Sequence, residues 1–187
     1  MENSKFVHSP FIKVVTNGGK WCILQARKVA YYIRKGDPRL LIGTYEHAFD
    51  AKGRVFIPSR WREAAGDTVV VMEGILGTGW GRCLFGMSVA QWEVFSARLS
   101  ELPMTDLAAQ AVKRRLYASA AACEVDKQGR ILIPANLRTR AGIGKEATLL
   151  GVGNRIEIWA TEELSAHQKK TGVDYDEALM HLAGMGI

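Results

Sequence analysis

The 187-residue sequence contains no apolar run near the roughly 20 residues that a membrane-spanning helix requires, so it predicts no transmembrane segment. Its three cysteines form no CxxC pair and cannot all be bridged, which argues against a disulfide framework and against a zinc site. Its four histidines lack the spacing of metal ligands. Basic residues interrupt the early apolar stretches before a signal-peptide core can form. We therefore expect a cytoplasmic protein with reduced thiols and no metal.

Sequence fingerprints of catalysis are missing as well. No nucleophile elbow, P-loop, HExxH or GxGxxG pattern occurs in the chain. No site for a small-molecule ligand or a cofactor is evident from the sequence either. We therefore expect a protein that is not an enzyme and needs no cofactor, which leaves binding as the class of function.

The net charge of +6 is confined to one end of the chain. Residues 1–42 hold eight basic and two acidic side chains, whereas residues 43–187 hold 17 of each sign. A basic extension favours an anionic partner such as nucleic acid. The rest of the chain is neutral overall and would have to bind such a partner through a few well-placed arginines or lysines.

A nine-residue motif occurs twice, as DAKGRVFIP at residues 50–58 and as DKQGRILIP at residues 126–134. With an offset of 76, eight of 17 positions are identical between residues 50–66 and residues 126–142. We interpret the chain as two tandem copies of one unit, because such similarity at a fixed offset is typical of an internal repeat.

Each copy contains the same succession of strands. A short strand leads into a turn with Asp at its first position and Gly at its fourth, as in type I turns. An apolar triplet follows, which we expect to be a strand buried on both faces and ended by a proline. Two further strands come after a short helix. The predicted strands are Tyr45–Phe49, Val55–Ile57, Thr68–Met72 and Cys83–Phe85, then Ala122–Val125, Ile131–Ile133, Ala147–Gly151 and Ile156–Trp159.

Capping residues mark the predicted helices. Ser59, Ser88, Thr105 and Thr161 each precede a segment with helical periodicity and can cap its first turn. The run Lys113-Arg114-Arg115 is interpreted as a solvated helix face. The predicted helices are Arg60–Ala65, Asn136–Ala141, one from Ser88 to Pro103, one from Thr105 to about Ala118, one from Thr161 and one over Asp174–Ala183.

A single copy of this unit is too small to hide the edges of its sheet. Two copies can interleave their strands into one closed barrel, which removes the edges. We predict an α+β, mainly β fold: a pseudo-twofold barrel with peripheral helices. The predicted divisions are a basic extension at 1–42, a first repeat at 43–103, a linking helix at 104–118, a second repeat at 119–170 and a tail at 171–187.

The charged residues of the two turns admit two interpretations. Asp50 and Arg54 flank the first turn at a spacing that allows an ion pair, as do Asp126 and Arg130 in the second. In the structural interpretation, Asp fixes the turn, Gly supplies its conformation and Arg neutralises Asp. In the functional interpretation, a pseudo-twofold axis places both arginines on one surface, where they contact phosphate or guanine and an Asp orients each. The other motif residues are Gly53, Gly129, Lys52 and Lys127.

The two aspartates also invite comparison with a catalytic carboxylate dyad, in which two carboxyl groups share a proton. Each Asp has an arginine four residues further on and a lysine close by. These cations would lower both pKa values and prevent proton sharing. The composition of the turns therefore disfavours catalysis.

The segments GTYEHAFDAKGRVFIPSRWRE, CEVDKQGRILIPANLR and GVGNRIEIW resemble the MraZ family of bacterial regulators, over roughly Gly43 to Gln168. The doubled DxxxR motif with its trailing Ile-Pro is highly specific to that family. The resemblance implies two AbrB-like (SpoVT-AbrB) halves that form a swapped-hairpin barrel within one chain. It also implies a homo-oligomeric ring and a nucleoid-associated repressor that binds G-rich direct repeats of double-stranded DNA in the promoter of its own division and cell-wall operon.

The resemblance assigns roles to individual residues of this chain. The arginines of the family's DxxxR motif contact DNA, which carries over to Arg54 and Arg130. Lys52 and Lys127 match basic turn positions and are expected to assist. Two further arginines on the short helices, Arg62 and Arg138, stay open between groove contact and helix-end packing.

Two segments depart from the family pattern. Members begin close to the position of Leu40, so residues 1–42 are extra. They could reflect an upstream start assigned in error, which we favour, or a basic DNA-binding arm, or a strand pair formed by Phe11–Val15, Trp21–Gln25 and Val29–Ile33 around Asn17–Gly19. The long turn Gly74–Arg82 is either an interface or a mobile loop.

Two other functions remain as alternatives. One is a ring-forming scaffold whose main partner is a protein. The other is an antitoxin-like AbrB relative that neutralises a toxin. The antitoxin is disfavoured because such proteins usually carry one motif per chain and a disordered tail, whereas here both motifs lie in one chain and the tail is predicted to be helical.

Overall fold

A computed structural model describes residues 11–15, 21–25, 40–74, 82–170 and 175–185. The chain divides into two compact units, Met1–Pro38 and Arg39–Ile187. In the first unit, β1 (Phe11–Val15) pairs with β2 (Trp21–Gln25) in an antiparallel hairpin, which confirms these two predicted strands. The predicted strand at 29–33, the turn at 17–19 and nearly all of the long turn at 74–82 lie outside the described residues.

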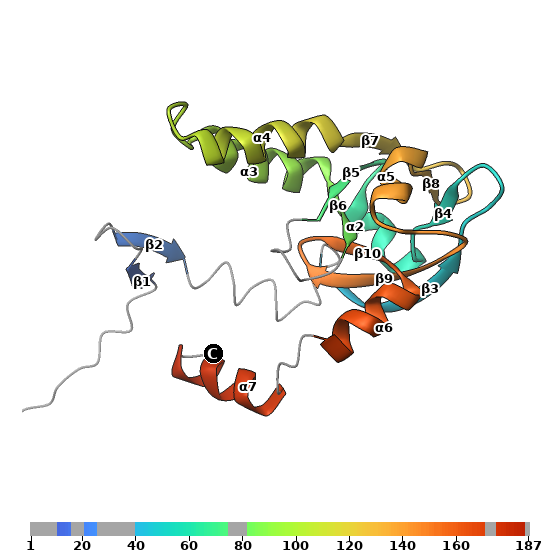
Figure 1. Cartoon of the computed structure of the whole chain (residues 1–187). Helices are drawn as coiled ribbons and strands as arrows, with labels where there is room; N and C mark the ends of the chain where they lie inside the picture. Colours follow the sequence, from blue (N-terminus) through green and yellow to red (C-terminus); the bar gives the residue numbers. More distant parts are fainter. Residues whose placement is uncertain (1–10, 16–20, 26–39, 75–81, 171–174, 186–187) are drawn as a thin grey trace, which may run out of the picture. The chain divides into compact units, whose positions relative to one another are not determined.

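The second unit is built on a six-stranded antiparallel sheet in the order β3-β9-β10-β6-β5-β7 (Figure 1). A separate two-stranded ribbon pairs β4 with β8. The fold is therefore α+β and mainly β, as predicted. The strands are β3 (Leu41–Ala48), β4 (Arg54–Phe56), β5 (Thr68–Glu73), β6 (Cys83–Ser88), β7 (Ala121–Glu124), β8 (Arg130–Leu132), β9 (Glu146–Gly153) and β10 (Ile156–Ala160).

The order of the strands shows that the two copies are interleaved. Strands β3, β5 and β6 of the first copy correspond to β7, β9 and β10 of the second. If each strand is replaced by its counterpart, the order of the sheet reads backwards and the same pairs of strands remain neighbours. Thus β3 of the first copy pairs with β9 of the second, and β7 of the second pairs with β5 of the first. The pseudo-twofold axis passes between β6 and β10, which pair with each other.

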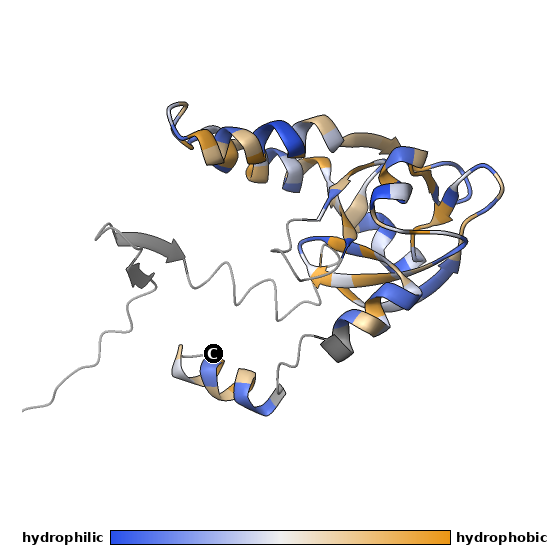
Figure 2. Ribbon diagram, in the orientation of Figure 1, coloured by the Kyte–Doolittle hydropathy of each residue, from blue (hydrophilic) through white to orange (hydrophobic). Residues whose placement is uncertain are grey.

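The ladders between described strands run from β3 to β7 and do not close into a ring, unlike the expected closed barrel. The reason lies in β4 and β8, which are three residues long and pair with each other instead of extending the sheet. Their inward side chains join the same hydrophobic core as the sheet, so the ribbon covers that core. Figure 2 shows hydrophobic residues along the strands and hydrophilic residues on the loop before β4.

The register of the ribbon is symmetric about Val55 and Ile131, which are opposite each other. Both are fully buried, as are Ile57 and Ile133, but Phe56 and Leu132 are exposed. The prediction that these triplets are buried on both faces was therefore wrong. Only one face of the ribbon meets the core, so the middle residue of each triplet points away from it.

Two hydrophobic clusters stabilise the second unit. The larger one joins the sheet to the ribbon and to the short helices, with Trp61 and Leu137 as equivalent anchors from the two copies. Trp61 also donates a hydrogen bond from Nε1 to the carbonyl of Ile42 at 2.9 Å. The smaller cluster, which includes Met72, Leu116 and Trp159, joins the other side of the sheet to the longer helices. This placement leaves the outer face of the ribbon free of core packing.

The helices follow the predicted plan with shifted starts. Ser59 does not cap a helix but begins a 3-10 turn, and Asp106 rather than Thr105 caps the linking helix, with Asp106 Oδ1 accepting from the amide of Ala109 at 3.0 Å. Ser88 is confirmed as a cap. The helices are η1 (Ser59–Trp61), α2 (Arg62–Ala65), α3 (Val89–Ser100), α4 (Leu107–Ser119), α5 (Ala135–Arg140), α6 (Thr161–Lys170) and α7 (Tyr175–Gly184).

Helices α3 and α4 form a hairpin that extends beyond the sheet (Figure 1). It is tied to the sheet by Glu73, a nearly buried residue of β5. Its carboxylate accepts from Arg115 Nε at 2.7 Å and from Arg140 Nη1 at 2.6 Å, which links β5 to α4 and α5. Burial raises the pKa of Glu73, but the two guanidinium groups lower it more, so the net shift is downward. Arg114 and Arg115 are exposed, as predicted for this run, and Arg115 reaches Glu73 from that exposed face.

We expect Arg115→Gln to lower the free energy of unfolding by about 1 kcal/mol, because it removes a charge-assisted hydrogen bond whose donor is largely exposed. Urea denaturation at pH 7 measures the change. The matched control is Arg114→Gln on the same helix, whose side chain is exposed and makes no contact among those recorded for the described residues. Equal stability of the two variants would show that Glu73 does not anchor the hairpin.

Candidate nucleic-acid interface

The first turn is built as its sequence predicts. Asp50 Oδ1 accepts hydrogen bonds from the main-chain amides of Lys52 at 3.0 Å and Arg54 at 2.9 Å. The amide of Gly53 donates to the carbonyl of Asp50 at 2.9 Å and closes the turn. Gly53 has a φ of 80°, a left-handed conformation that glycine adopts without a Cβ penalty. The aspartate thus fixes the chain just before β4 begins.

The second turn repeats this arrangement ahead of β8. Asp126 Oδ1 accepts from the amides of Gln128 and Arg130, both at 2.9 Å. The amide of Gly129 donates to the carbonyl of Asp126 at 2.7 Å, and Gly129 has a φ of 82°. The structural part of the prediction for Asp50, Gly53, Asp126 and Gly129 is therefore confirmed.

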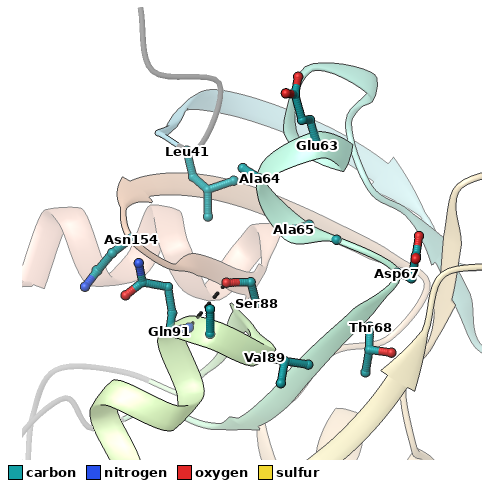
Figure 3. A pocket seen from close by; sticks show the side chains of 12 residues that line it. Leu41, Glu63, Ala64, Ala65, Asp67, Thr68, Ser88, Val89, Gln91 and Asn154 are labelled. Carbon is teal, nitrogen blue, oxygen red and sulfur yellow. Dashed lines mark hydrogen bonds between the residues drawn. The ribbon is translucent and has the colours of Figure 1, made fainter. Parts of the chain in front are cut away.

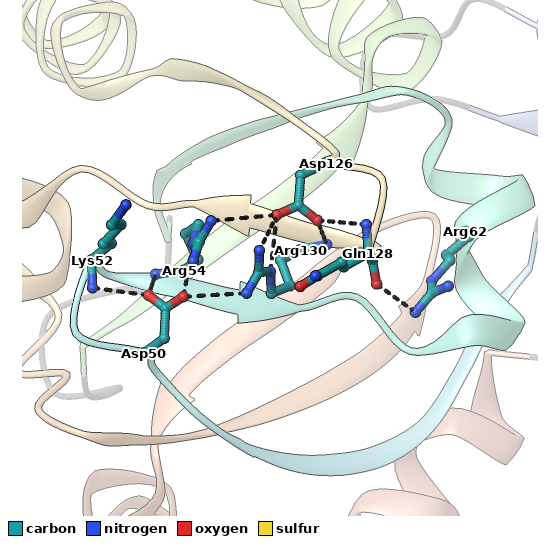
Figure 4. A network of polar contacts seen from close by, with 7 residues as sticks. All are labelled: Asp50, Lys52, Arg54, Arg62, Asp126, Gln128 and Arg130. Atoms are coloured by element: carbon teal, nitrogen blue, oxygen red, sulfur yellow. Dashed lines mark hydrogen bonds and ion pairs between the residues drawn. The ribbon is translucent and has the colours of Figure 1, made fainter.

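The structure brings the two aspartates and the two motif arginines together into one cluster, the Asp–Arg quartet of Asp50, Arg54, Asp126 and Arg130 (Figure 4). Each arginine binds its own aspartate through Nε, at 2.7 Å in the first copy and 2.9 Å in the second. Each also reaches the aspartate of the other copy, at 3.7 Å from Arg54 Nη1 and 3.5 Å from Arg130 Nη1. The quartet therefore joins the two halves across the ribbon.

These contacts hold both aspartates ionised. The main-chain amide of Arg54 contributes most to lowering the pKa of Asp50; burial opposes it, and the Arg54 guanidinium group and the amide of Lys52 add to the lowering, so the net shift is downward. The side chain of Arg130 contributes most at Asp126 and lowers its pKa from 3.8 to about 2. A carboxylate dyad needs one raised pKa, so the geometry weighs against the catalytic alternative.

The quartet lies at the outer surface and is partly open to solvent. The side chain of Arg54 is 29% exposed and that of Arg130 is 16% exposed. The guanidinium carbon of Arg130 lies 5.8 Å from the centre of the Phe56 ring, whereas Leu132 takes the equivalent place beside Arg54. Both guanidinium groups are thus oriented by aspartates in side chains that are partly exposed, and an oriented arginine fork suits contact with a phosphate or a guanine.

The two lysines singled out from the sequence are both exposed, but they do not occupy equivalent positions. With the offset of 76, Lys52 corresponds to Gln128 and Lys127 corresponds to Ala51. Each turn therefore carries one lysine, at its third position in the first copy and at its second position in the second copy. The sequence already contained this difference.

The arginines of the short helices support the turns of the opposite copy. Arg62 Nη2 donates to the carbonyl of Gln128 at 3.3 Å, and its guanidinium group lies against Gly129. Arg138 lies against Gly53 in the same way and over the ring of Phe49 at 5.5 Å. In this structure Arg62 and Arg138 therefore both pack on a turn. Sequence reasoning missed this contact because it crosses between copies.

A hollow of about 440 Å³ lies beside the start of α3, away from the ribbon (Figure 3). Its charged lining residues, Glu63 and Asp67, are both acidic. A negative lining would repel a polyanion such as DNA. Within the described part of the chain, no group of three or more His, Cys, Asp or Glu side chains could hold a metal ion. Likewise, no helix among those residues is both long and apolar enough to cross a bilayer.

Comparison with known proteins shows extensive similarity. A family model described as "MraZ protein, putative antitoxin-like" matches residues 40–115 and again residues 116–177. The "Transcriptional regulator MraZ" of Thermoanaerobacter sp. (strain X514) is 43% identical over 148 residues, which are 79% of this chain and 100% of that protein. The protein of the same name from Lactiplantibacillus plantarum is 40% identical over 143 residues, covering 76% of this chain and 98% of the relative.

We predict that the Asp126 carboxyl titrates with a pKa of about 2 in the folded protein, measured by carbon NMR of the side chain. Because the folded pKa lies below the ordinary 3.8, the ion pair contributes stability that is complete above pH about 4. That stability is lost as the pH falls through about 2. Asp126→Asn should remove this part of the acid dependence, and a folded pKa of 3.8 or higher would contradict the assignment.

We predict that Gly129→Ala lowers the free energy of unfolding by at least about 1–2 kcal/mol, because alanine must adopt a left-handed conformation there. The new methyl group would also displace the guanidinium group of Arg62. Thermal and urea unfolding measure the loss. Gly144→Ala is the control, since its Cβ would meet no atom within 4 Å, and it should stay within about 0.5 kcal/mol of the parent.

Proposed function

The chain belongs to the MraZ family, and we propose on this basis and on the geometry of the ribbon that it is a transcriptional regulator that binds double-stranded DNA. The relatives are named as transcriptional regulators, which supports this class of function. The two halves are AbrB-like, and the ribbon between them is the surface that meets DNA. We place its activity in the cytoplasm, on the nucleoid.

One observation carries this proposal: the Asp–Arg quartet holds two guanidinium groups side by side on the outer face of a two-stranded ribbon. The major groove of DNA is about 12 Å wide and admits such a ribbon. Arginine can bind guanine O6 and N7 through two hydrogen bonds. In this mode Arg54 and Arg130 exchange their weaker cross-copy contacts for base or phosphate contacts and keep their own aspartates.

The exposed lysines extend the same surface. Lys52 and Lys127 lie on the turns that flank the quartet, where an ammonium group can contact phosphate. Phosphate contacts supply affinity that falls with salt concentration, while base contacts supply discrimination between sequences. Arg62 and Arg138 act indirectly, by holding the two turns in place.

We further propose that the protein acts as a homo-oligomeric ring on G-rich direct repeats in its own division and cell-wall operon and represses that operon. One ribbon offers few contacts, so a single copy would bind DNA weakly. Neighbouring copies in a ring would engage adjacent repeats at a high effective concentration and raise the overall affinity. Exposed apolar side chains near the tip of the α3–α4 hairpin, Met104 and Leu107, are consistent with contacts between copies.

The description of the family model as antitoxin-like keeps a second function in view. In that case the ribbon would still bind DNA, and a toxin would dock elsewhere. A protein-interaction scaffold is the other alternative. A gel shift with G-rich direct repeats against scrambled DNA, at two salt concentrations, separates the scaffold from the main proposal, because a scaffold would not prefer the repeats.

We predict that Arg54→Ala and Arg130→Ala each weaken binding to repeat DNA by about 5- to 150-fold, the loss of one bidentate contact of about 1–3 kcal/mol. Arg54→Lys should keep the salt-dependent part of the affinity and lose discrimination between repeats and scrambled DNA, because lysine lacks the planar fork. Fluorescence anisotropy with labelled duplexes measures both quantities.

The control for these variants is Arg98→Ala on α3, an exposed arginine outside the ribbon that should bind DNA like the parent. Thermal unfolding and size-exclusion chromatography report whether each variant keeps its fold and its assembly. If Arg54→Ala and Arg130→Ala stay folded and bind repeat DNA as the parent does, the ribbon is not the DNA-binding surface.

A further inference from the structure

The two turns share the same main-chain hydrogen bonds and a left-handed glycine but differ in side chains at their two exposed positions. The first turn reads Asp-Ala-Lys-Gly at 50–53 and the second reads Asp-Lys-Gln-Gly at 126–129. At the third position the main-chain amide donates to the turn aspartate in both copies, from Lys52 at 3.0 Å and from Gln128 at 2.9 Å. The two side chains therefore start from equivalent points, and both are exposed.

These two positions lie at opposite ends of the ribbon. In the antiparallel register Arg54 is opposite Leu132 and Phe56 is opposite Arg130, so each turn enters the ribbon at a different end. Figure 4 shows the same arrangement, with Lys52 beyond Asp50 on one side of the quartet and Gln128 beyond Asp126 on the other. A duplex lying along the ribbon would meet Ala51 and Lys52 at one end and Lys127 and Gln128 at the other, so at the third turn position it meets lysine at one end and glutamine at the other.

The two side chains offer different hydrogen-bonding groups to a base edge. A lysine ammonium only donates, and it suits the two acceptors of guanine, O6 and N7. A glutamine amide donates and accepts, and it suits adenine, which presents the N6 donor beside the N7 acceptor. The quartet itself is nearly symmetric, so the two turns differ at their exposed positions, and at the third position the difference is lysine against glutamine.

The end that carries glutamine is also held more firmly. The carbonyl of Gln128 accepts a hydrogen bond from Arg62 at 3.3 Å, and no such bond to the carbonyl of Lys52 is recorded among the described residues. The side chain of Arg130 makes two hydrogen bonds to Asp126 where that of Arg54 makes one to Asp50, and Arg130 is the less exposed of the two. The main chain of this turn is therefore held by one more contact, and the exposed Gln128 side chain starts from a firmly placed backbone.

We propose that Lys52 and Gln128 are specificity-determining residues that give the ribbon a direction on DNA, with the Lys52 end preferring guanine and the Gln128 end preferring adenine. This inference rests on the proposed function. A pseudo-twofold surface with identical turns would prefer a palindrome. A surface with unlike ends binds a non-palindromic site in one orientation, so neighbouring copies in one orientation match repeats that run in the same direction.

The test uses variants that make the two turns alike without changing the net charge. Lys127→Ala with Gln128→Lys gives the full-length chain a second turn equal to the first. Ala51→Lys with Lys52→Gln gives it a first turn equal to the second. In vitro selection from a DNA duplex library with a randomised centre yields the preferred sequence of each protein, and competition between selected duplexes yields the strength of each preference.

The parent is expected to select a non-palindromic sequence with guanine toward one end and adenine toward the other. The first double variant should select guanine at both ends and the second adenine at both ends, each with a shift of about tenfold or more in preference at the altered position. Two variants of opposite design keep the test decisive if one of them fails to fold, which thermal unfolding and size-exclusion chromatography would reveal.

Selection of the same sequence by the parent and by a folded double variant would overturn this inference and leave the proposed function intact. Failure of the parent to enrich any sequence from the library would instead overturn the proposed function. A palindromic parent sequence would also contradict the assignment, since it would mean that the two ends are read alike.

Discussion

The contacts of two aspartates with two arginines fix the two turns, join the two halves of the chain and orient the groups that the proposed activity uses. Asp50 and Asp126 each use one oxygen to fix a turn and the other to hold a guanidinium group. The cross-copy contacts of Arg54 and Arg130 then join the two halves. Because each carboxylate already serves both tasks, the arginines are oriented before any partner arrives, so little ordering is required on binding.

Much of this arrangement was predictable from the sequence because it is local. The spacing of Asp and Gly fixes a turn within four residues, and the turn in both copies is as expected. The strands follow from short apolar runs, and the offset of 76 between the motifs identified the two copies. The resemblance of both motifs to the MraZ family supplied the expectation of an oligomeric ring and of a regulatory role, which local patterns do not contain.

The rest depends on contacts between residues that are distant in sequence. The apolar triplets in the sequence did not show that the ribbon has one exposed face. Phe56 and Leu132 were therefore wrongly expected to be buried. The packing of Arg62 on Gly129 joins residues 67 positions apart, and the anchoring of the α3–α4 hairpin by Glu73 requires three separate elements. The cap predicted at Ser59 is absent because Pro58 takes the N-cap position, as Pro134 does ahead of α5.

The central claim is that the outer face of the ribbon, with its two guanidinium groups, is the surface that meets DNA. NMR of the arginine Nε–H groups during titration with repeat duplex tests it most directly, since it reports each side chain in the unaltered protein. The account predicts that the signals of Arg54 and Arg130 change with the bound fraction while that of Arg98 stays in place. Unchanged signals from both quartet arginines in a saturated complex would contradict the account.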